Sequence, residues 1–451
     1  MTSAAVHPAS PEVLSRPPHD APVVTGLGVV SPCGLGTEAH WGATLAGHRG
    51  ITPITRFDAA RYPVRVAGQI PGFTASEFVP GRLIAQTDRW TQLGLAAAAL
   101  ALADARLDPA ELPTYEMAIV TASSTGGVEF GQREIERLWK VNPRHVSAYQ
   151  SIAWFYAATT GQISVRYGMR GPCNVIATEQ AGGLDALGHA RRLLRSDARM
   201  VLAGGTDAPL CPYSWVCQLS SGILSARDAP DRAYLPFDAD ADGYVPGEGG
   251  AMLVVENARA AAARSAPQLY GTIAGYAATF DPPPGSDRPP GLLRAVRSAL
   301  DDARITPEQV DVVFADGSGV PDRDRQEAAA LAAVFGPYGV PVTVPKTMTG
   351  RLYGGGSALD VVNALLAIRD GVIPPTVGVH RLPDDYRVDL VRNRPREAPV
   401  GNALVLARGF GGFNAALVVQ AAPGLPGREP DTTAPDTTTH DTTTHDPIRE
   451  K

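Results

Sequence analysis

The residue best placed to do chemistry is Gln180, within the stretch NVIATEQAGGLDALGHARRLL. The apolar run 175–178 predicts a strand, the Gly pair after Gln180 a sharp turn, and residues 184–194 a helix. A residue at such a turn lies at a helix N-terminus, where backbone N–H groups and the helix dipole favour negative charge. A cysteine there would have a lowered pKa and could act as a nucleophile. The carboxamide of Gln180 cannot, although its NH₂ group can donate hydrogen bonds.

The elements around Gln180 alternate between strand and helix signals, which predicts an α/β fold with largely parallel sheets. The stretch PVTVPKTMTGRLYGGGSALDVVNALLAI repeats the order strand, turn, glycines, helix, and a second helix is expected over 358–369. Two similar halves predict a duplicated, layered α/β/α architecture. The expected strands are 23–24, 118–121, 175–178, 200–203, 252–255, 310–314 and 403–407.

The ends of the chain differ from its middle in composition. Residues 1–21 are rich in Ala, Pro and Ser and predict a flexible arm, whereas the Thr/Asp-rich repeat over 423–451 predicts a disordered tail. Between them we expect an N-terminal half over 22–265 and a C-terminal half over 266–422.

Composition excludes several function classes. The formal net charge of −6 comes without a basic patch, so no nucleic-acid partner is expected. The longest nearly apolar stretch, 93–105, is too short to span a membrane, and with no secretory signal a cytoplasmic location is expected. The four cysteines form no CxxC motif and are expected to be small buried hydrophobes, so no metal site is implied. No GxGxxG turn follows a strand, which argues against a dinucleotide cofactor.

Several motifs occur in a specific order over residues 22–420: VVTGLGVVSPCGLG, GPCNVIATEQAGG, YLPFDADADGYVPGEGGAMLVVE, VFADGSGVPDRDRQEAAAL, PKTMTGRLYGGG and GFGGFN. With them the chain resembles the β-ketoacyl synthases, and among these the chain-length factors (ketosynthase β subunits) of type II polyketide synthases. The resemblance implies a thiolase-like fold of two layered α/β/α/β/α halves.

Condensing members of that family use one Cys and two His. Matched motif by motif, the Cys position is Gln180 and the two His positions are Asp316 and Arg351, while Lys346 and Glu327 keep the family's Lys and Glu. The resemblance therefore implies a subunit of an acyltransferase complex that lacks the condensing triad. It implies pairing with a ketosynthase α subunit, and substrates delivered on the phosphopantetheine arm of an acyl carrier protein. No tightly bound cofactor is implied.

Gln180 has two interpretations. Its amide could donate to a malonyl thioester carbonyl and stabilise the enolate formed on decarboxylation, which would make the chain a producer of acetyl primer. Alternatively, Gln180 fills the vacated pocket and hydrogen-bonds its neighbours. Loss of both His positions favours the second interpretation. A third hypothesis is a binding protein that only stabilises the condensing subunit.

The segment GGVEFGQREIERLW predicts a helix over 126–139 on which Val128, Gly131 and Ile135 share one face. This stripe could be core or subunit interface. The resemblance implies that the stripe lines the end of the polyketide tunnel together with Tyr213, and that Phe410 in GFGGFN is a gate residue. Because the stripe carries no aromatic residue, we expect a long product, beyond the octaketide class.

Overall fold

The computed structural model describes residues 21–283 and 285–422, and one large sheet runs through them. Its order is β13-β11-β10-β15-β16-β9-β1-β8-β7-β5-β6, with β2 paired to β1. The predicted tail and residues 1–20 of the predicted arm lie outside the described residues. The strands of the large sheet are β1 (Pro22–Ser31), β2 (Gly34–Leu35), β5 (Met117–Ala122), β6 (Cys173–Ile176), β7 (Met200–Asp207), β8 (Gly249–Asn257), β9 (Gly271–Phe280), β10 (Val312–Phe314), β11 (Pro341–Thr343), β13 (Asp389–Leu390), β15 (Asn402–Arg408) and β16 (Phe413–Gln420). Two small sheets pair β3 (Ile51–Pro53) with β4 (Val66–Gly68), and β12 (Val372–Ile373) with β14 (Arg396–Glu397).

The directions of these strands correct one expectation. The outer pairs β5–β6, β5–β7, β10–β11, β10–β15 and β11–β13 are parallel, as predicted. The central pairs β1–β8, β7–β8, β1–β9, β9–β16 and β15–β16 are antiparallel, so the sheet is mixed. The short turn 409–412 between β15 and β16 shows why, because so short a connection can join only antiparallel neighbours.

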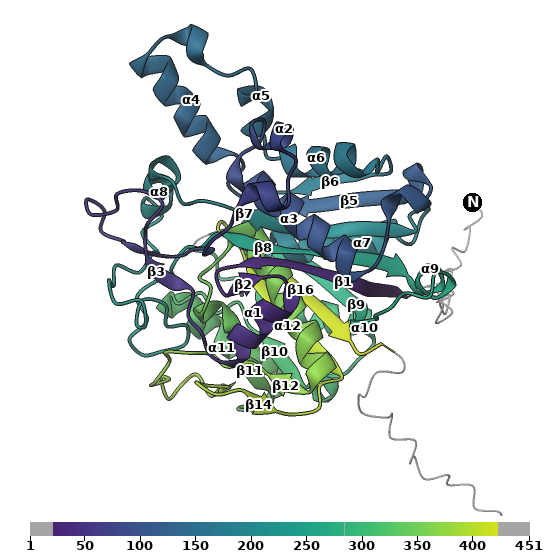
Figure 1. The fold of residues 1–451 in the computed structure, drawn as a ribbon. Coiled ribbons are helices and arrows are strands. Elements are labelled where there is room, and N and C mark those ends of the chain that lie inside the picture. Colours follow the sequence, from purple (N-terminus) through teal and green to yellow (C-terminus); the bar gives the residue numbers. More distant parts are fainter. Residues whose placement is uncertain (1–20, 284, 423–451) are drawn as a thin grey trace, which may run out of the picture.

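The helices form layers on both sides of the sheet (Figure 1). α3 packs on β1 and β8, and α10 packs on β9 and β16, while α7 and α12 pack against each other and against the sheet. The helices are α1 (Thr37–Leu45), α2 (Gly81–Ile84), α3 (Arg89–Asp104), α4 (Val128–Lys140), α5 (Gln150–Ala153), α6 (Ala158–Tyr167), α7 (Gly182–Leu193), α8 (Pro212–Leu219), α9 (Ala258–Ala263), α10 (Leu292–Ala303), α11 (Pro321–Phe335) and α12 (Gly356–Asp370). In the described ranges, none of them has the length and apolar character needed to cross a bilayer.

The contact between α7 and α12 depends on a glycine. A Cβ on Gly183 would lie 2.4 Å from the backbone nitrogen of Ala358, so no larger residue fits. The hydroxyl of Ser357 accepts a hydrogen bond from the N–H of Leu184 at 3.2 Å, which joins the first turns of the two helices. The predicted duplication is therefore confirmed as two strand–turn–helix units whose helices meet at their N-terminal ends.

The cysteine expectation holds for two positions and is wrong for two. All four cysteines are free thiols; Cys33 and Cys211 are buried, whereas Cys173 and Cys217 are exposed. Cys173 is exposed because it begins β6, the last strand of the large sheet, whose outer edge has no partner strand in the described part of the chain. Cys217 lies on an exposed side of α8.

A buried histidine joins the N-terminal strand to α12. His40 lies 2.8 Å from the hydroxyl of Ser31 through Nδ1 and 2.9 Å from Oδ1 of Asn363 through Nε2. Because that amide oxygen only accepts, Nε2 carries a proton, and in the neutral imidazole Nδ1 is then the acceptor that faces the hydroxyl of Ser31. Burial lowers the pKa of His40 to about 4, although the hydrogen bond that His40 donates to Asn363 opposes this shift.

We expect His40 to make the fold sensitive to acid. Above pH 6.5 the histidine is neutral in both folded and unfolded chains; between pH 6.5 and about 4 only the unfolded chain takes up the proton. The free energy of unfolding should therefore fall by about 3 kcal/mol across this range because of His40. Urea unfolding at several pH values measures this. Between pH 6.5 and 4 the free energy of unfolding should fall less in His40→Gln than in His48→Gln, a change at an exposed histidine. Equal acid slopes in both variants would contradict the assignment.

Candidate functional site

Gln180 lies in a tight turn between β6 and α7, in the short 3₁₀ segment Glu179–Ala181. Glu179 has φ of +54°, an unusual value for a residue with a side chain, and this conformation makes the turn sharp. Gln180 is 4% exposed, and its Oε1 lies 3.3 Å from where a Cβ on Gly356 would be. The predicted turn at a helix N-terminus is thus present, and Gln180 lies between the first turns of α7 and α12.

The amide nitrogen of Gln180 is buried without a hydrogen-bond partner among the described residues. The expectation that Gln180 fills the pocket agrees with its burial, whereas the expected hydrogen bonding to neighbours is not seen at Nε2. An unpaired buried N–H costs free energy, about 1–3 kcal/mol. The turn therefore holds a buried hydrogen-bond donor that the described residues leave unused.

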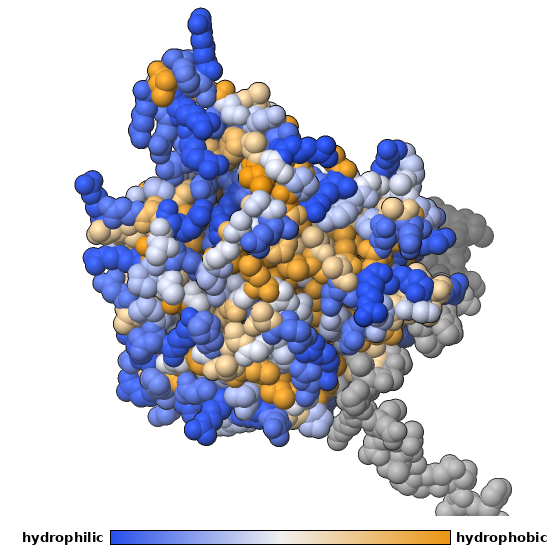
Figure 2. Space-filling model, in the orientation of Figure 1, coloured by the Kyte–Doolittle hydropathy of each residue, from blue (hydrophilic) through white to orange (hydrophobic). Residues whose placement is uncertain are grey.

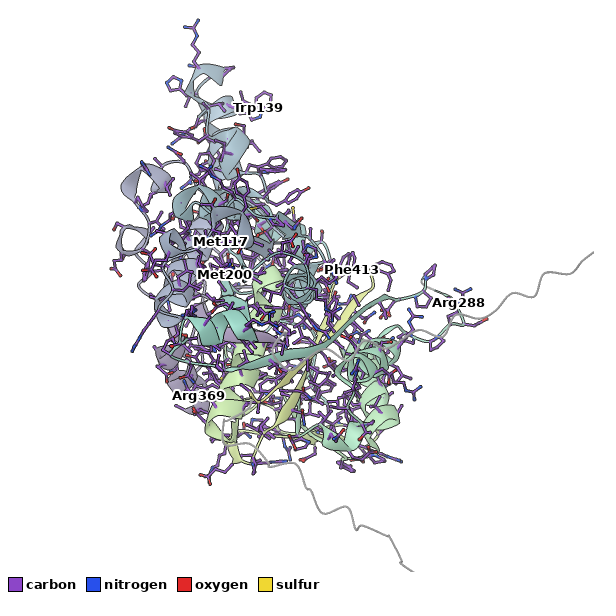
Figure 3. All side chains as sticks on the ribbon, turned by 90° about the vertical axis from the view of Figure 1, so that its right-hand side faces the viewer. Met117, Trp139, Met200, Arg288, Arg369 and Phe413 are labelled. Carbon is purple, nitrogen blue, oxygen red and sulfur yellow. The ribbon has the colours of Figure 1, made fainter. Side chains whose placement is uncertain are left out.

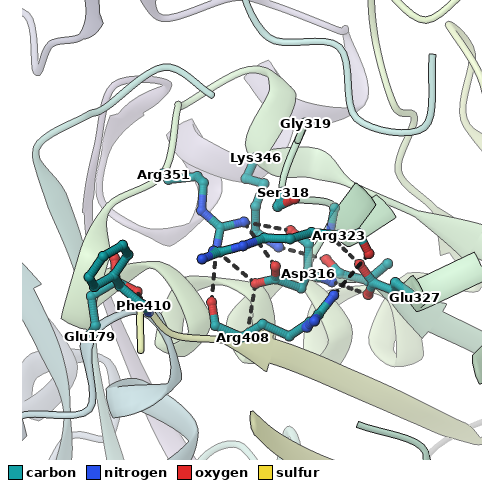
Figure 4. Close-up of polar contacts among 12 residues, drawn as sticks. Glu179, Asp316, Ser318, Gly319, Arg323, Glu327, Lys346, Arg351, Arg408 and Phe410 are labelled. Atoms are coloured by element: carbon teal, nitrogen blue, oxygen red, sulfur yellow. Dashed lines mark hydrogen bonds and ion pairs between the residues drawn. The ribbon is translucent and has the colours of Figure 1, made fainter. Parts of the chain in front are cut away.

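Asp316 and Arg351, the two positions expected to carry histidine in a condensing enzyme, form an ion pair (Figure 4). Both residues are 2% exposed. Nη2 of Arg351 donates to Oδ1 of Asp316 at 2.9 Å, and Nη1 donates to Oδ2 at 3.1 Å. The backbone N–H of Arg408 also donates to Oδ1 at 2.9 Å, and Arg351 donates to the backbone oxygens of Asp316 and Arg408. Both carboxylate oxygens of Asp316 and both terminal nitrogens of Arg351 therefore have hydrogen-bond partners.

This pairing fixes the charges of both groups. Burial alone would raise the pKa of Asp316, but the charges of Arg351 and Lys346 outweigh it and hold that pKa below its usual range. Burial would lower the pKa of Arg351, but Asp316 holds it above its usual range. A carboxylate that does not take up a proton and a guanidinium that does not release one cannot serve as a general acid or base. The pair therefore does not replace the two histidines chemically.

Lys346 and Glu327, the retained family positions, form hydrogen bonds with the backbone of residues 315–317, next to this ion pair. Nζ of Lys346 donates to the carbonyl of Ala315 at 2.7 Å and forms an ion pair with Asp360 at 2.7 Å. The carboxylate of Glu327 accepts from the N–H groups of Asp316 and Gly317 at 2.8 and 2.9 Å. Burial, with help from the charge of Asp316, raises the pKa of Glu327 to about 7. Both residues therefore act on the position of the 315–317 loop.

Phe410 is tied to the Gln180 turn by a contact that sequence analysis missed. The backbone N–H of Phe410 donates to Oε2 of Glu179 at 2.8 Å, while the Phe410 side chain is largely exposed. Burial raises the pKa of Glu179, and the charge of Arg351 opposes this. The only sequence signal for Glu179 was its place next to Gln180. Gln180, the ion pair and the predicted gate residue thus belong to one site.

The predicted chain-length residues lie elsewhere, on α4 and α8. α4 extends away from the layered body, and Trp139 lies near its far end (Figures 1 and 3). Ile135 is 49% exposed, Val128 is partly buried and Gly131 is buried. The N–H of Tyr213 donates to Oε1 of Gln132 at 2.9 Å, so the structure does bring Tyr213 next to this helix.

Gly131 is covered rather than open. A Cβ on Gly131 would lie 2.9 Å from Cδ1 of Trp154, a residue at the end of α5 that sequence analysis did not single out. Trp154 is 55% exposed, so part of its indole faces outward beside the α4 stripe. The space that a small residue leaves at position 131 is therefore taken by a tryptophan from the neighbouring helix.

An unusual number of large apolar side chains is exposed around α4, α5 and α8, and we call this region the α4 surface. On the face seen in Figure 2 the projection is mainly hydrophilic, with apolar atoms near its tip. Exposed aromatic clusters of this kind mark interaction sites. The large exposed side chains of the α4 surface are Ile135, Trp139, Tyr149, Ile152, Trp154, Phe155, Tyr156 and Tyr213.

Comparisons with known proteins agree with this geometry. Models of the N-terminal and C-terminal domains of β-ketoacyl synthase match residues 21–261 and 270–380. The tetracenomycin polyketide synthase ketoacyl synthase beta subunit of Streptomyces glaucescens is 59% identical over 399 residues, which are 88% of this chain and 98% of that protein. The solved ishigamide ketosynthase/chain length factor aligns with a TM-score of 0.82 at 28% identity, covering 90% of this chain and all of that one. A second solved structure holds a type II polyketide synthase acyl-carrier protein in complex with its ketosynthase. One chain of that complex aligns with a TM-score of 0.82 at 28% identity, covering 89% of this chain and all of the matched chain. The chain belongs to the β-ketoacyl synthase family, and within it to the ketosynthase β subunits, or chain-length factors, of type II polyketide synthases.

Proposed function

We propose that this chain is a non-condensing polyketide synthase subunit that pairs with a condensing ketosynthase α subunit, shapes the polyketide tunnel and sets product length. One observation carries the proposal. Gln180 and the buried Asp316–Arg351 pair occupy the three catalytic positions, while the fold around them is intact. A chain built in this way keeps the surfaces of a ketosynthase without its chemistry, so the Cys and both His must come from the partner.

The partner surface is supported by two features. The α4 surface exposes aromatic side chains that a stable interface would bury. The strand β6 leaves the end of the large sheet open, and a homologous subunit could continue the sheet by pairing with it. The acyl carrier protein, with its phosphopantetheine arm, would then deliver malonyl units and the growing chain to the α subunit. The solved complex of a carrier protein with its ketosynthase supports this arrangement by similarity.

The chain-length role rests on α4. Val128, Gly131 and Ile135 lie on the projecting helix, Ile135 within the α4 surface, and they would face a tunnel formed at the subunit interface. Trp154 adds bulk next to Gly131, so the tunnel end is defined by the stripe and this indole together. A product longer than an octaketide remains our proposal, based on the aliphatic residues at positions 128 and 135.

Coexpression tests the pairing. The full chain, with a condensing α subunit, is expected to copurify as a heterodimer. Ile152→Asp and Tyr156→Asp, which place charges on the α4 surface, should each weaken copurification. Tyr338→Asp is the matched control, since Tyr338 is also exposed but lies between α11 and β11. A chain that purifies alone and does not bind any α subunit would rule out the proposed pairing.

Decarboxylation of malonyl thioesters is the second candidate, and the unpaired buried amide nitrogen of Gln180 favours it. We expect the isolated chain to release CO₂ from malonyl carrier protein no faster than the carrier protein alone, because the Asp316–Arg351 ion pair occupies the two histidine positions. Gln180→Ala should therefore change nothing in this assay. A rate well above background that falls about 100-fold or more in Gln180→Ala would instead establish the decarboxylase, since one oxyanion donor has an effect of that size.

A further inference from the structure

The N-terminus of α4 has an unusual cap. Helices begin with free N–H groups that a side chain at the N-cap position commonly satisfies. The N-cap residue of α4 is Gly127, which has no side chain for this task. A Cβ at Gly127 would lie 1.8 Å from the carbonyl oxygen of Ala153, so Ser, Asp or Asn cannot replace it there. The helix must therefore obtain its cap from another part of the chain.

That cap comes from Asp88. Oδ2 of Asp88 accepts the N–H of Phe130, the third residue of α4, at 2.6 Å. The other oxygen, Oδ1, accepts the N–H of Trp90 at 3.1 Å and caps α3, whose N-cap residue is Asp88 itself. The side chain is fully buried at 0% exposure. One carboxylate thus accepts an N–H group from the first turn of each of two helices, one in the layered body and one in the projection.

Among the described residues, few other polar contacts join α4 to the layered body. Arg56 pairs with Glu129 at 2.7 Å near the protein surface, and Gln132 accepts from Tyr213 of α8. Glu134 accepts from the N–H of Ser147, a contact within the projection itself. Asp88 is the buried polar contact between α3, which packs on the central strands, and the helix that carries the stripe.

We propose that Asp88 is a positioning residue for chain-length control, because its carboxylate fixes where α4 begins and hence where the stripe lies in the tunnel. This inference rests on the proposed function. Asp88 touches no substrate; it acts through the position of Val128, Gly131 and Ile135. Loss of the cap should let the first turn of α4 fray, so that the tunnel end is less sharply defined.

The test uses Asp88→Ser in the full chain, coexpressed with the condensing α subunit. Serine is a good N-cap for its own helix, so α3 keeps its cap, but its shorter side chain does not reach Phe130. Asp88→Asn is the second variant, because an amide can present an oxygen to only one of the two N–H groups. Asp108→Ser is the matched control, since Asp108 caps the short segment Pro109–Glu111 on the surface.

Two readouts are compared, hydrogen exchange of residues 128–140 and product masses. In Asp88→Ser we expect faster exchange in the first turns of α4. The ratio of off-length products to the main product should rise about fivefold, as expected from the loss of one helix cap. Asp108→Ser should change neither readout. A folded Asp88→Ser heterodimer with unchanged product ratios would overturn the inference, whether or not exchange is faster.

Ile135→Phe separates this inference from the proposed function. If Ile135→Phe shortens the products while Asp88→Ser leaves them unchanged, only the role of Asp88 fails. If neither variant changes the products of a folded, active heterodimer, the chain-length role of α4 fails with it.

Discussion

Replacing Arg351 with alanine is expected to lower the free energy of unfolding by about 3–5 kcal/mol, the largest effect of any substitution in the site. Asp316 is 2% exposed, and the change removes the arginine that donates to both of its carboxylate oxygens. It also frees the carbonyl of Arg408, which accepts from Arg351. Urea unfolding of the purified chain measures the loss. Arg325→Ala is the control, because its pair with Asp322 is exposed and should contribute about 0–1 kcal/mol.

The double variant Asp316→Leu/Arg351→Met shows whether the loss comes from an uncompensated charge. Removing both charges leaves none buried without its partner, so the double variant should be about as stable as the wild type or more stable, and at least about 3 kcal/mol more stable than Arg351→Ala. This would show that the loss in Arg351→Ala comes from a buried charge left without its partner. Arg351→Ala with nearly wild-type stability would mean that the pair does not support the site.

Introducing phenylalanine at position 135 is expected to shift the products of the heterodimer toward shorter chains. Ile135 is 49% exposed, so a larger ring extends outward toward the proposed tunnel instead of into the core. Because steric exclusion of a few atoms discriminates at least about tenfold, the ratio of long to short products should fall by that factor or more. Mass analysis of the products measures it. Trp139→Phe, at the exposed far end of α4, is the matched control.

Gly131→Phe tests the same tunnel from a position where the structure places an obstacle. Its Cβ would lie 2.9 Å from Trp154, so the indole has to move before the new ring fits. The double variant Gly131→Phe/Trp154→Ala removes that obstacle. It should shorten the products and form the heterodimer more readily than Gly131→Phe alone, in which the displaced indole disturbs the α4 surface. If Ile135→Phe, Gly131→Phe and Gly131→Phe/Trp154→Ala all make wild-type products from stable heterodimers, α4 does not define the tunnel end.

The local elements around the site could be predicted because their signals are local. The apolar run, the Gly pair and the helical pattern around Gln180 occupy consecutive residues, and the structure places β6, the turn and α7 there. The same holds for the second copy around α12. Strand directions could not be predicted in this way, since an apolar run has the same composition in a parallel and an antiparallel pair. The antiparallel pairing of the central strands was missed for that reason.

The contacts that define the site are long-range, and this is why sequence patterns did not reveal them. Asp316 and Arg351 were identified one by one as replaced positions, but their pairing depends on two loops brought together by the fold. The bond from Phe410 to Glu179 joins residues 231 positions apart. Asp88 was not singled out, because its second hydrogen bond, to Phe130, exists only once α3 and α4 lie together.

The central claim is that this chain sets product length while its partner performs the condensation. The most direct test compares product masses from one condensing α subunit with its carrier protein, expressed alone, with this chain, or with a different β subunit. We predict no polyketide from the α subunit alone, a defined long product with this chain, and a different length when the β subunit is exchanged. Identical product lengths with both β subunits would contradict the claim and leave this chain as a stabiliser of the condensing subunit.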